Sequence, residues 1–367
     1  MRNKLAIGVA LAATLSAASV AAADTIRATS GFGPDHPLAV SIYPELGARL
    51  AEFTNGAWDL EDTPSGLVAP NEMNAALRDG VTDFGALVLP YFSAEFAEAS
   101  LPSELSIIGK SSLAISSAVT EYVATCAECQ AEFARNGEVY LGSDATPPYN
   151  LLTVEPIRGI ADLAGVRIRT GAPIFAAFVK EQRGVVVQFP SSELADKLSR
   201  GAVAGSFSGD QEIIANRLEG LVRYVTEIEL GVYNGTAATT ASRKLWERMA
   251  PGERAALARA SQYGLAKGVG EFIAEAEAAR AIEGIELIEM DESLKEAKRG
   301  FVDRQLANAA RILESRGVTD AQAKIYRYVM LVGKWEALIS PDMTAEELGQ
   351  LRYDEIFKKL DMATYGG

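Results

Sequence analysis

An alternation of strand and helix patterns is the feature of this sequence that most constrains its fold. Residues 25–29 form a short β-prone run, and residues 39–52 carry apolar side chains at helical spacing. A buried strand is expected at residues 83–89, where Pro90 ends it. Because helix and strand patterns alternate to about residue 230, the sequence predicts an α/β fold with largely parallel sheets covered by helices.

The first 23 residues have the layout of a cleaved secretory signal peptide. Arg2 and Lys4 precede an Ala-rich apolar run at residues 5–20, and the alanines at 21–23 offer a small-residue cleavage site. The apolar run is too short to span a bilayer comfortably, and no later uncharged run reaches that length. We therefore expect an exported protein that does not insert into the membrane.

Length and charge limit the architecture and the partners of the mature chain. Without the leader, 344 of the 367 residues remain, which is more than one hydrophobic core usually serves, so two lobes are expected. Loss of Arg2 and Lys4 takes the formal net charge from −14 to −16. Such an acidic surface disfavours nucleic acid and anionic membranes as partners, but a pocket can still carry local positive charge for an anionic ligand.

The second half of the chain is mainly helical. Residues 242–285 are rich in Ala and Glu, with Pro251 at a helix start, while Gly264, Gly268 and Gly270 argue against one uninterrupted helix. Further helices are expected at residues 292–316, at residues 320–338 and from Thr344 onward. Since no linker separates the two expected lobes, the chain should cross between them more than once.

The two cysteines, Cys126 and Cys129, predict a local disulfide in an exported protein. Two residues three apart on a helix have Cα atoms about 5 Å apart, within the disulfide range of about 4.4–6.8 Å. Reduced thiols and a redox-active pair are the alternatives. A zinc site would need two more ligands, and the chain has a single histidine, His36.

His36 is interpreted as a loop residue, because no recognisable catalytic partner accompanies it. The sequence has no nucleophile elbow, no phosphate-binding glycine loop and no zinc-helix motif. We therefore expect no enzymatic activity, no cofactor and no metal site.

Three stretches in register resemble the TRAP transporter solute-binding protein family, the extracytoplasmic receptors of tripartite periplasmic uptake systems in bacteria. The first is residues 31–37 with the helix after them and the turn Thr54-Asn55-Gly56-Ala57. The second is IRGIADLAGVRIR at residues 157–169, and the third runs from GVVVQFPSSEL at 184–194 to LSRGAVAG at 198–205. Together they extend the resemblance over nearly the whole mature chain.

The resemblance implies a two-lobed periplasmic-binding-protein fold with mixed sheets, crossing strands and a long inter-lobe helix, which closes around its ligand by hinge motion. It also implies a periplasmic location and two membrane partners, one small and one large TRAP subunit. The expected division is a signal peptide at 1–23, a first lobe at 24–148 plus about 235–276, a second lobe at 149–234 plus about 277–337, and a helical tail at 338–367.

Arg169 is the principal candidate for ligand binding, because its planar guanidinium can hold a carboxylate with two parallel hydrogen bonds. Arg158 and Arg167 are equally visible in the sequence, and strand alternation alone does not choose between Arg167 and Arg169. The family resemblance selects Arg169, at a strand end that should face the cleft.

The remaining candidates surround the expected cleft, although core packing or a turn role is the alternative for each. Ser208 replaces an asparagine that binds the carboxylate in many members, residues 147–151 lack a second arginine, and Leu87 and Val88 stand where a polar contact is common. These departures favour a monocarboxylate with an apolar body over dicarboxylates and sialic acid. The expected ligand contacts are Arg169, Tyr149, Asn150, Phe207, Ser208, Tyr233, Asn234 and Val88.

Two other functions are compatible with the same features. The chain could be a binding protein of another transporter or sensor system, or an exported hydrolase. The lack of a recognisable nucleophile and base argues against the hydrolase.

Overall fold

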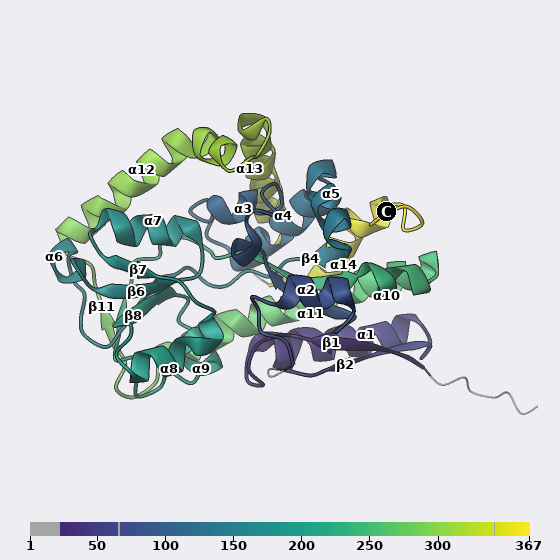
Figure 1. The fold of residues 1–367 in the computed structure, drawn as a ribbon, viewed down its shortest axis with the longest axis horizontal. Coiled ribbons are helices and arrows are strands. Elements are labelled where there is room, and N and C mark those ends of the chain that lie inside the picture. Colours follow the sequence, from purple (N-terminus) through teal and green to yellow (C-terminus); the bar gives the residue numbers. More distant parts are fainter. Residues whose placement is uncertain (1–22, 65–66, 341) are drawn as a thin grey trace, which may run out of the picture.

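A computed structural model describes residues 23–64, 67–340 and 342–367, and it has two lobes, each built on its own sheet (Figure 1). The predicted signal peptide, apart from residue 23, lies outside the described residues. In the part of the chain that is described, no helix is long and apolar enough to cross a membrane.

The first sheet is mixed, because one strand runs against its neighbours. Strands β1, β2 and β3 are parallel, and β10 pairs antiparallel with both β3 and β4. Helices α1, α2, α4 and α5 pack on this sheet. In sheet order the strands are β2 (Trp58–Asp62), β1 (Asp24–Thr29), β3 (Phe84–Val88), β10 (Thr236–Ser242) and β4 (Glu138–Gly142).

Helices of the first lobe follow the predicted pattern in most places. The expected helix at 39–52 begins as a π-helical turn, η1 (Leu38–Ile42), and continues as α1 (Tyr43–Phe53). The other short helices here are α2 (Met73–Asp79), η2 (Leu89–Phe92), α3 (Leu101–Glu104), α4 (Ser112–Ala124), α5 (Ala127–Asn136) and α10 (Arg243–Arg248).

The second sheet is also mixed and has a hydrophobic cluster on each face. Leu151 and Leu152 are adjacent on β5 and enter different clusters, as strand alternation requires. Helices α7 (Pro173–Glu181) and α12 (Glu292–Ser315) contribute to one cluster, and α8 (Leu194–Ser199) and α9 (Glu212–Ala215) to the other. In sheet order the strands are β11 (Glu286–Ile288), β9 (Tyr224–Thr226), β5 (Asn150–Thr153), β8 (Gly205–Ser208), β6 (Arg167–Thr170) and β7 (Val185–Val187). Two further short helices, α6 (Ile160–Leu163) and η3 (Ser191–Glu193), complete this lobe.

Two crossing segments join the sheets side by side. The first links β4 to β5, and the second links β9 to β10. The N–H of Thr146 donates to the carbonyl of Tyr233 at 3.0 Å, and the N–H of Tyr149 donates to the carbonyl of Gly231 at 2.8 Å. The two crossings therefore form one hydrogen-bonded ladder between the lobes.

Helix α11 (Pro251–Arg280) is a single helix of 30 residues, although its glycines had weakened the expectation of one uninterrupted helix. Two of the glycines permit a close approach to η1 rather than breaking the helix. A Cβ added at Gly264 would lie 2.5 Å from the carbonyl oxygen of Ile42, and one at Gly268 would lie 2.0 Å from Ile42 Cγ1. Gly270 is exposed, with nothing within 4 Å of an added Cβ.

The expected lobe boundaries need correction after α12. Leu294 and Phe301 pack in the second lobe, but Ala309 and Leu313 pack in the core of the first. Helix α12 thus arches from one lobe to the other, and α13 (Ala321–Leu338) packs on α4 of the first lobe (Figure 1). Residues up to 337 therefore do not all belong to the second lobe, because apolar contacts change lobes along α12.

The C-terminal segment is part of the first lobe rather than a separate tail. It contains α14 (Ala345–Glu355) and η4 (Phe357–Lys359), and α14 packs on α11. Trp246 Nε1 donates to the carbonyl of Tyr365 at 2.9 Å, and the Tyr365 hydroxyl donates to the carbonyl of Tyr140 at 2.7 Å.

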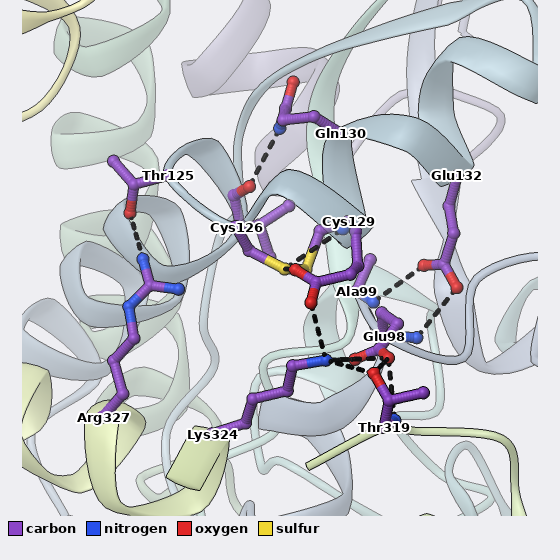
Figure 2. The surroundings of a disulfide bond; sticks show 12 residues. Glu98, Ala99, Thr125, Cys126, Cys129, Gln130, Glu132, Thr319, Lys324 and Arg327 are labelled. Atoms are coloured by element: carbon purple, nitrogen blue, oxygen red, sulfur yellow. Dashed lines mark hydrogen bonds and ion pairs between the residues drawn. A yellow bond between two sulfur atoms is a disulfide. The ribbon is translucent and has the colours of Figure 1, made fainter. Parts of the chain in front are cut away.

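The predicted disulfide between Cys126 and Cys129 is confirmed, with Cα atoms 5.2 Å apart. Its position differs from the prediction, because Cys126 caps the start of α5 after α4 has ended. Figure 2 shows that Lys324 of α13 reaches this region, where its Nζ lies 2.9 Å from Glu98 and 3.2 Å from Glu128. These ion pairs fasten α13 to the first lobe beside the disulfide.

The glycine contacts of α11 give a direct test of the packing between α11 and η1. Replacing Gly264 by Ala should lower the free energy of unfolding by about 1–3 kcal/mol, because its Cβ would overlap the backbone of Ile42. The matched control, Gly270→Ala, should leave stability unchanged or raise it by up to about 1 kcal/mol. Urea unfolding measures both, and equal effects of the two substitutions would contradict the packing described.

Candidate functional site

A cavity between the lobes is the candidate functional site. It is lined by the loop after β1, the end of β3 with η2, both crossing segments, and the residues after β6. The cavity has a volume of about 30 Å³, and the atom-free space of about 450 Å³ around it includes open solvent. Strand ends that open into a crevice are the usual place for ligands in α/β sheets.

Arg169 enters this cavity from β6 and is almost completely buried, with 2% of its surface exposed. Its Nε donates to the carbonyl of Phe189 at 3.1 Å, and its Nη2 donates to the hydroxyl of Tyr91 at 3.1 Å. Within the described residues it forms no ion pair. A Cβ added at Gly171 would lie 3.3 Å from Nη1, so the glycine leaves room for the guanidinium. The side chain therefore keeps free N–H donors within reach of the cavity.

The structure separates Arg169 from the other two arginines of this region. Arg167 is exposed on the same strand, where Nη2 donates to the carbonyl of Gly201 at 2.7 Å. Arg158 pairs with Glu286 at 3.2 Å on the surface. Only Arg169 of these three lines the cavity.

Three apolar or aromatic candidates also line the cavity, and one does not. Tyr149 and Tyr233 come from the two crossing segments, and their rings stack at 5.4 Å with an interplanar angle of 10°. Val88 lines the cavity at the end of β3. Phe207 lies outside the lining, because its ring packs against Phe175 in the core at 5.5 Å.

The three polar candidates lie outside the cavity lining and form local hydrogen bonds. The Asn150 amide donates to Asp210 at 2.9 Å, and its oxygen accepts from the N–H of Glu229 at 2.9 Å. The Ser208 hydroxyl lies 2.5 Å from that of Ser206, and the Asn234 amide donates to a backbone carbonyl two residues before it. Their sequence pattern did not distinguish these structural roles from ligand contacts.

His36 is a cavity residue that the sequence interpretation missed. It is buried, its ring stacks on Phe32 at 4.3 Å, and it meets Phe272 edge-on at 5.5 Å. Its Nδ1 accepts from the N–H of Leu38 at 3.2 Å, so the neutral ring carries its proton on Nε2. Burial lowers the pKa of His36 to about 3. Its place in the loop that follows β1 was the signal that could have indicated a cleft position.

Two buried acids, Asp144 and Glu212, also line the cavity and were not predicted. Burial raises the pKa of Asp144 to about 7, and burial likewise raises the pKa of Glu212. Across the described residues, no group of three or more His, Cys, Asp and Glu side chains is arranged to hold a metal ion. The cavity thus combines one buried cation with two buried acids among aromatic rings.

Comparison with protein-family models identifies the family of this chain. A sequence model of "Bacterial extracellular solute-binding protein, family 7" matches residues 32–308. A curated relative, the outer membrane transporter protein TsaT of Comamonas testosteroni, is 24% identical over 271 residues, which cover 72% of this chain and 78% of the relative.

Solved structures share the fold at low sequence identity. A TRAP periplasmic solute-binding protein from Bordetella bronchiseptica with bound (R)- and (S)-mandelate matches with a TM-score of 0.75 and 22% identity, covering 85% of this chain and 99% of that one. A TRAP solute-binding protein from Rhodoferax ferrireducens with copurified benzoate matches at 0.74 and 18%, covering 86% and 100%. A marine metagenome TRAP protein specific for aromatic acids, in complex with metahydroxyphenylacetate, matches at 0.73 and 19%, covering 85% and 99%.

The buried, neutral state of His36 predicts a specific pH dependence of stability. Because its pKa falls from 6.5 in the unfolded chain to about 3 in the fold, its contribution is complete above pH 6.5 and declines as the pH falls toward 3. Between pH 7.5 and pH 5 this contribution should fall by about 2 kcal/mol. The variant His36→Asn lacks the titrating imidazole. Because His36 is the single histidine of the chain, the variant contains no other imidazole.

Urea unfolding of both proteins at the two pH values measures the difference. The stability advantage of the wild type over His36→Asn should be about 2 kcal/mol smaller at pH 5 than at pH 7.5. An advantage that is the same at both pH values would show that His36 is not held neutral by burial.

Proposed function

The chain belongs to family 7 of the bacterial extracellular solute-binding proteins and is a TRAP-type solute receptor, and we propose that its ligand is a small monocarboxylate held by Arg169. The single observation that carries this proposal is the buried guanidinium of Arg169. A cation taken out of water is costly unless a partner compensates it. Arg169 has only neutral hydrogen-bond partners among the described residues, and the buried acid Glu212 acts on it by charge without forming an ion pair. A ligand carboxylate supplies a counter-charge that the guanidinium can bond directly.

The planar guanidinium suits this role. Its occupied donors point to Phe189 and Tyr91, and the free Nη1 group can donate two hydrogen bonds. A carboxylate that accepts such charge-assisted bonds is held in a fixed orientation. Because Tyr91 belongs to the first lobe and Arg169 to the second, a ligand bound here contacts both lobes at once.

The neighbouring walls favour a ligand with an apolar or aromatic body. Val88, Tyr149 and Tyr233 line the cavity beside Arg169. A second hollow, which shares Tyr91 and Gly171 with the cavity, is lined by three prolines and Phe189 together with the polar residues Asn71, Thr170 and Gln188. The mandelate, benzoate and hydroxyphenylacetate bound by the structural neighbours are acids of this kind, and they support an aromatic acid as the ligand class.

The proposal also covers release of the ligand and the absence of chemical conversion. We propose that the paired crossing segments act as the hinge about which the lobes open. We propose that the receptor acts in the periplasm and passes its ligand, unchanged, to a small and a large TRAP membrane subunit. His36 uses Nδ1 to accept from Leu38, so its free nitrogen is a donor and not a general base.

Substitution of Arg169 tests the proposal. A thermal-shift screen of benzoate, mandelate, 3-hydroxyphenylacetate and succinate selects the probe, and calorimetry then measures its affinity. Arg169→Ala should weaken binding by about 30- to 5,000-fold, because the ligand carboxylate loses its buried partner. Arg169→Lys should also bind poorly, since an ammonium lacks the two-pronged geometry.

Arg167→Ala is the matched control, because Arg167 lies on the same strand but is exposed and bonded to carbonyls of residues 201 and 202. Its affinity should stay within about threefold of the wild type, the range of ordinary surface substitutions. Native affinity in Arg169→Ala, with a loss in Arg167→Ala, would refute the assignment of Arg169.

A further inference from the structure

Asp144 is a cavity residue with a buried carboxylate oxygen for which the described chain supplies no hydrogen-bond donor. It follows β4 in the first crossing segment, lines the cavity and is only 3% exposed. Its Oδ1 is buried without a hydrogen-bond partner, and the carboxylate forms no ion pair among the described residues. The donor that acts on the carboxylate within the described chain is the backbone N–H of Asp144 itself. A buried carboxylate oxygen without a donor is unfavourable, so Oδ1 of Asp144 calls for a partner from outside the chain.

The buried cation Arg352, whose charge acts on Asp144, does not provide that partner. Its guanidinium donates to Gln262 at 3.2 Å, to Ser116 at 2.8 Å and to Thr120 at 2.7 Å. Arg352 lowers the pKa of Asp144 by its charge, but burial outweighs it and raises that pKa to about 7. The two side chains form no ion pair among those found in the described residues.

Other buried acids show how this protein usually satisfies a carboxylate. Glu98 pairs with Lys324, Glu132 accepts two backbone N–H bonds, and Asp210 pairs with Arg280. Glu138 has no partner for either oxygen within the described chain, but it does not line the cavity. Among the described residues, Asp144 is the buried acid that lines the cavity and has a carboxylate oxygen without a hydrogen-bond partner.

We propose that Asp144 accepts a hydrogen bond from a donor group on the ligand, so that the site selects carboxylic acids that also carry a hydroxyl or ammonium group. The proposal rests on the proposed function, since it assumes that the ligand carboxylate is bound at Arg169. Arg169 belongs to the second lobe and Asp144 follows a strand of the first. A ligand with an acid at one end and a donor at the other would therefore be held from both lobes.

His36 favours a hydroxyl as this donor group. Its Nε2–H has no hydrogen-bond partner among the described side chains, because the bond to Leu38 uses Nδ1. A hydroxyl can donate to Asp144 and accept from such an N–H at the same time, whereas an ammonium group has no lone pair to accept. An ammonium would instead gain the stronger charge attraction to Asp144.

A matched series of ligands tests the proposal by calorimetry at pH 7.5. Phenylacetate has no donor besides its acid, mandelate and 3-hydroxyphenylacetate carry a hydroxyl at different positions, and phenylglycine carries an ammonium group. At least one donor-bearing acid should bind the wild type about 10- to 100-fold more tightly than phenylacetate. The better of the hydroxyl and ammonium probes identifies the donor group.

Asp144→Ala should bring this affinity ratio close to one, because the donor group of the ligand loses its acceptor. If that variant does not fold, Asp144→Asn should lower the ratio at least about threefold, because a neutral oxygen accepts a weaker hydrogen bond. Glu138→Gln is the control, since Glu138 is buried and unpartnered among the described residues but lies outside the cavity lining. This control should leave the ratio unchanged.

The outcomes separate this inference from the proposed function. Binding of all probes through Arg169 without any preference for a donor would overturn the role of Asp144 alone, as would an unchanged ratio in Asp144→Ala. An equal loss of the ratio in Glu138→Gln would show that the effect is structural. Failure of every carboxylate to bind would overturn the proposed function, and this inference with it.

Discussion

Burial of the Arg169 guanidinium at the junction of the lobes is the interaction on which the account of this receptor depends. Its bonds to Phe189 and Tyr91 fix its position, but they leave its charge without an acid partner among the described residues. A protein that keeps such a cation in a water-poor cavity gains most when an anion enters. The fold therefore prepares the site by holding a charge in place before the ligand arrives, which reduces the reorganisation needed on binding.

The two lobes are held in register by contacts that depend on small residues and backbone pairing. The crossing segments bond to each other through Thr146 and Tyr149, and they carry the stacked rings of Tyr149 and Tyr233 into the cavity. Gly264 and Gly268 let α11 lie directly against η1. The stacked rings of Tyr149 and Tyr233 thus lie on the same two crossing segments that connect the lobes. A movement of the lobes about these segments therefore also moves the two rings.

The α/β class, most elements and the disulfide could be predicted, because they follow from local periodicity and spacing. The choice of Arg169 came from family resemblance, since alternation along β6 could not separate it from Arg167. The cavity roles of His36 and Asp144 were beyond the sequence, because Phe32, Phe272 and Arg352 meet them only in the folded chain. Phe207 and Asn150 are of types that often contact ligands, but the sequence could not show that they have structural roles here. Phe207 packs in the core, and Asn150 donates a hydrogen bond to Asp210.

A crystal structure of the protein with its tightest-binding carboxylate tests the central claim most directly. The account predicts that the ligand lies in the cavity between the lobes, with its carboxylate oxygens about 2.7–2.9 Å from guanidinium nitrogens of Arg169. A ligand bound elsewhere, or bound in the cavity with its carboxylate directed away from Arg169, would contradict the account.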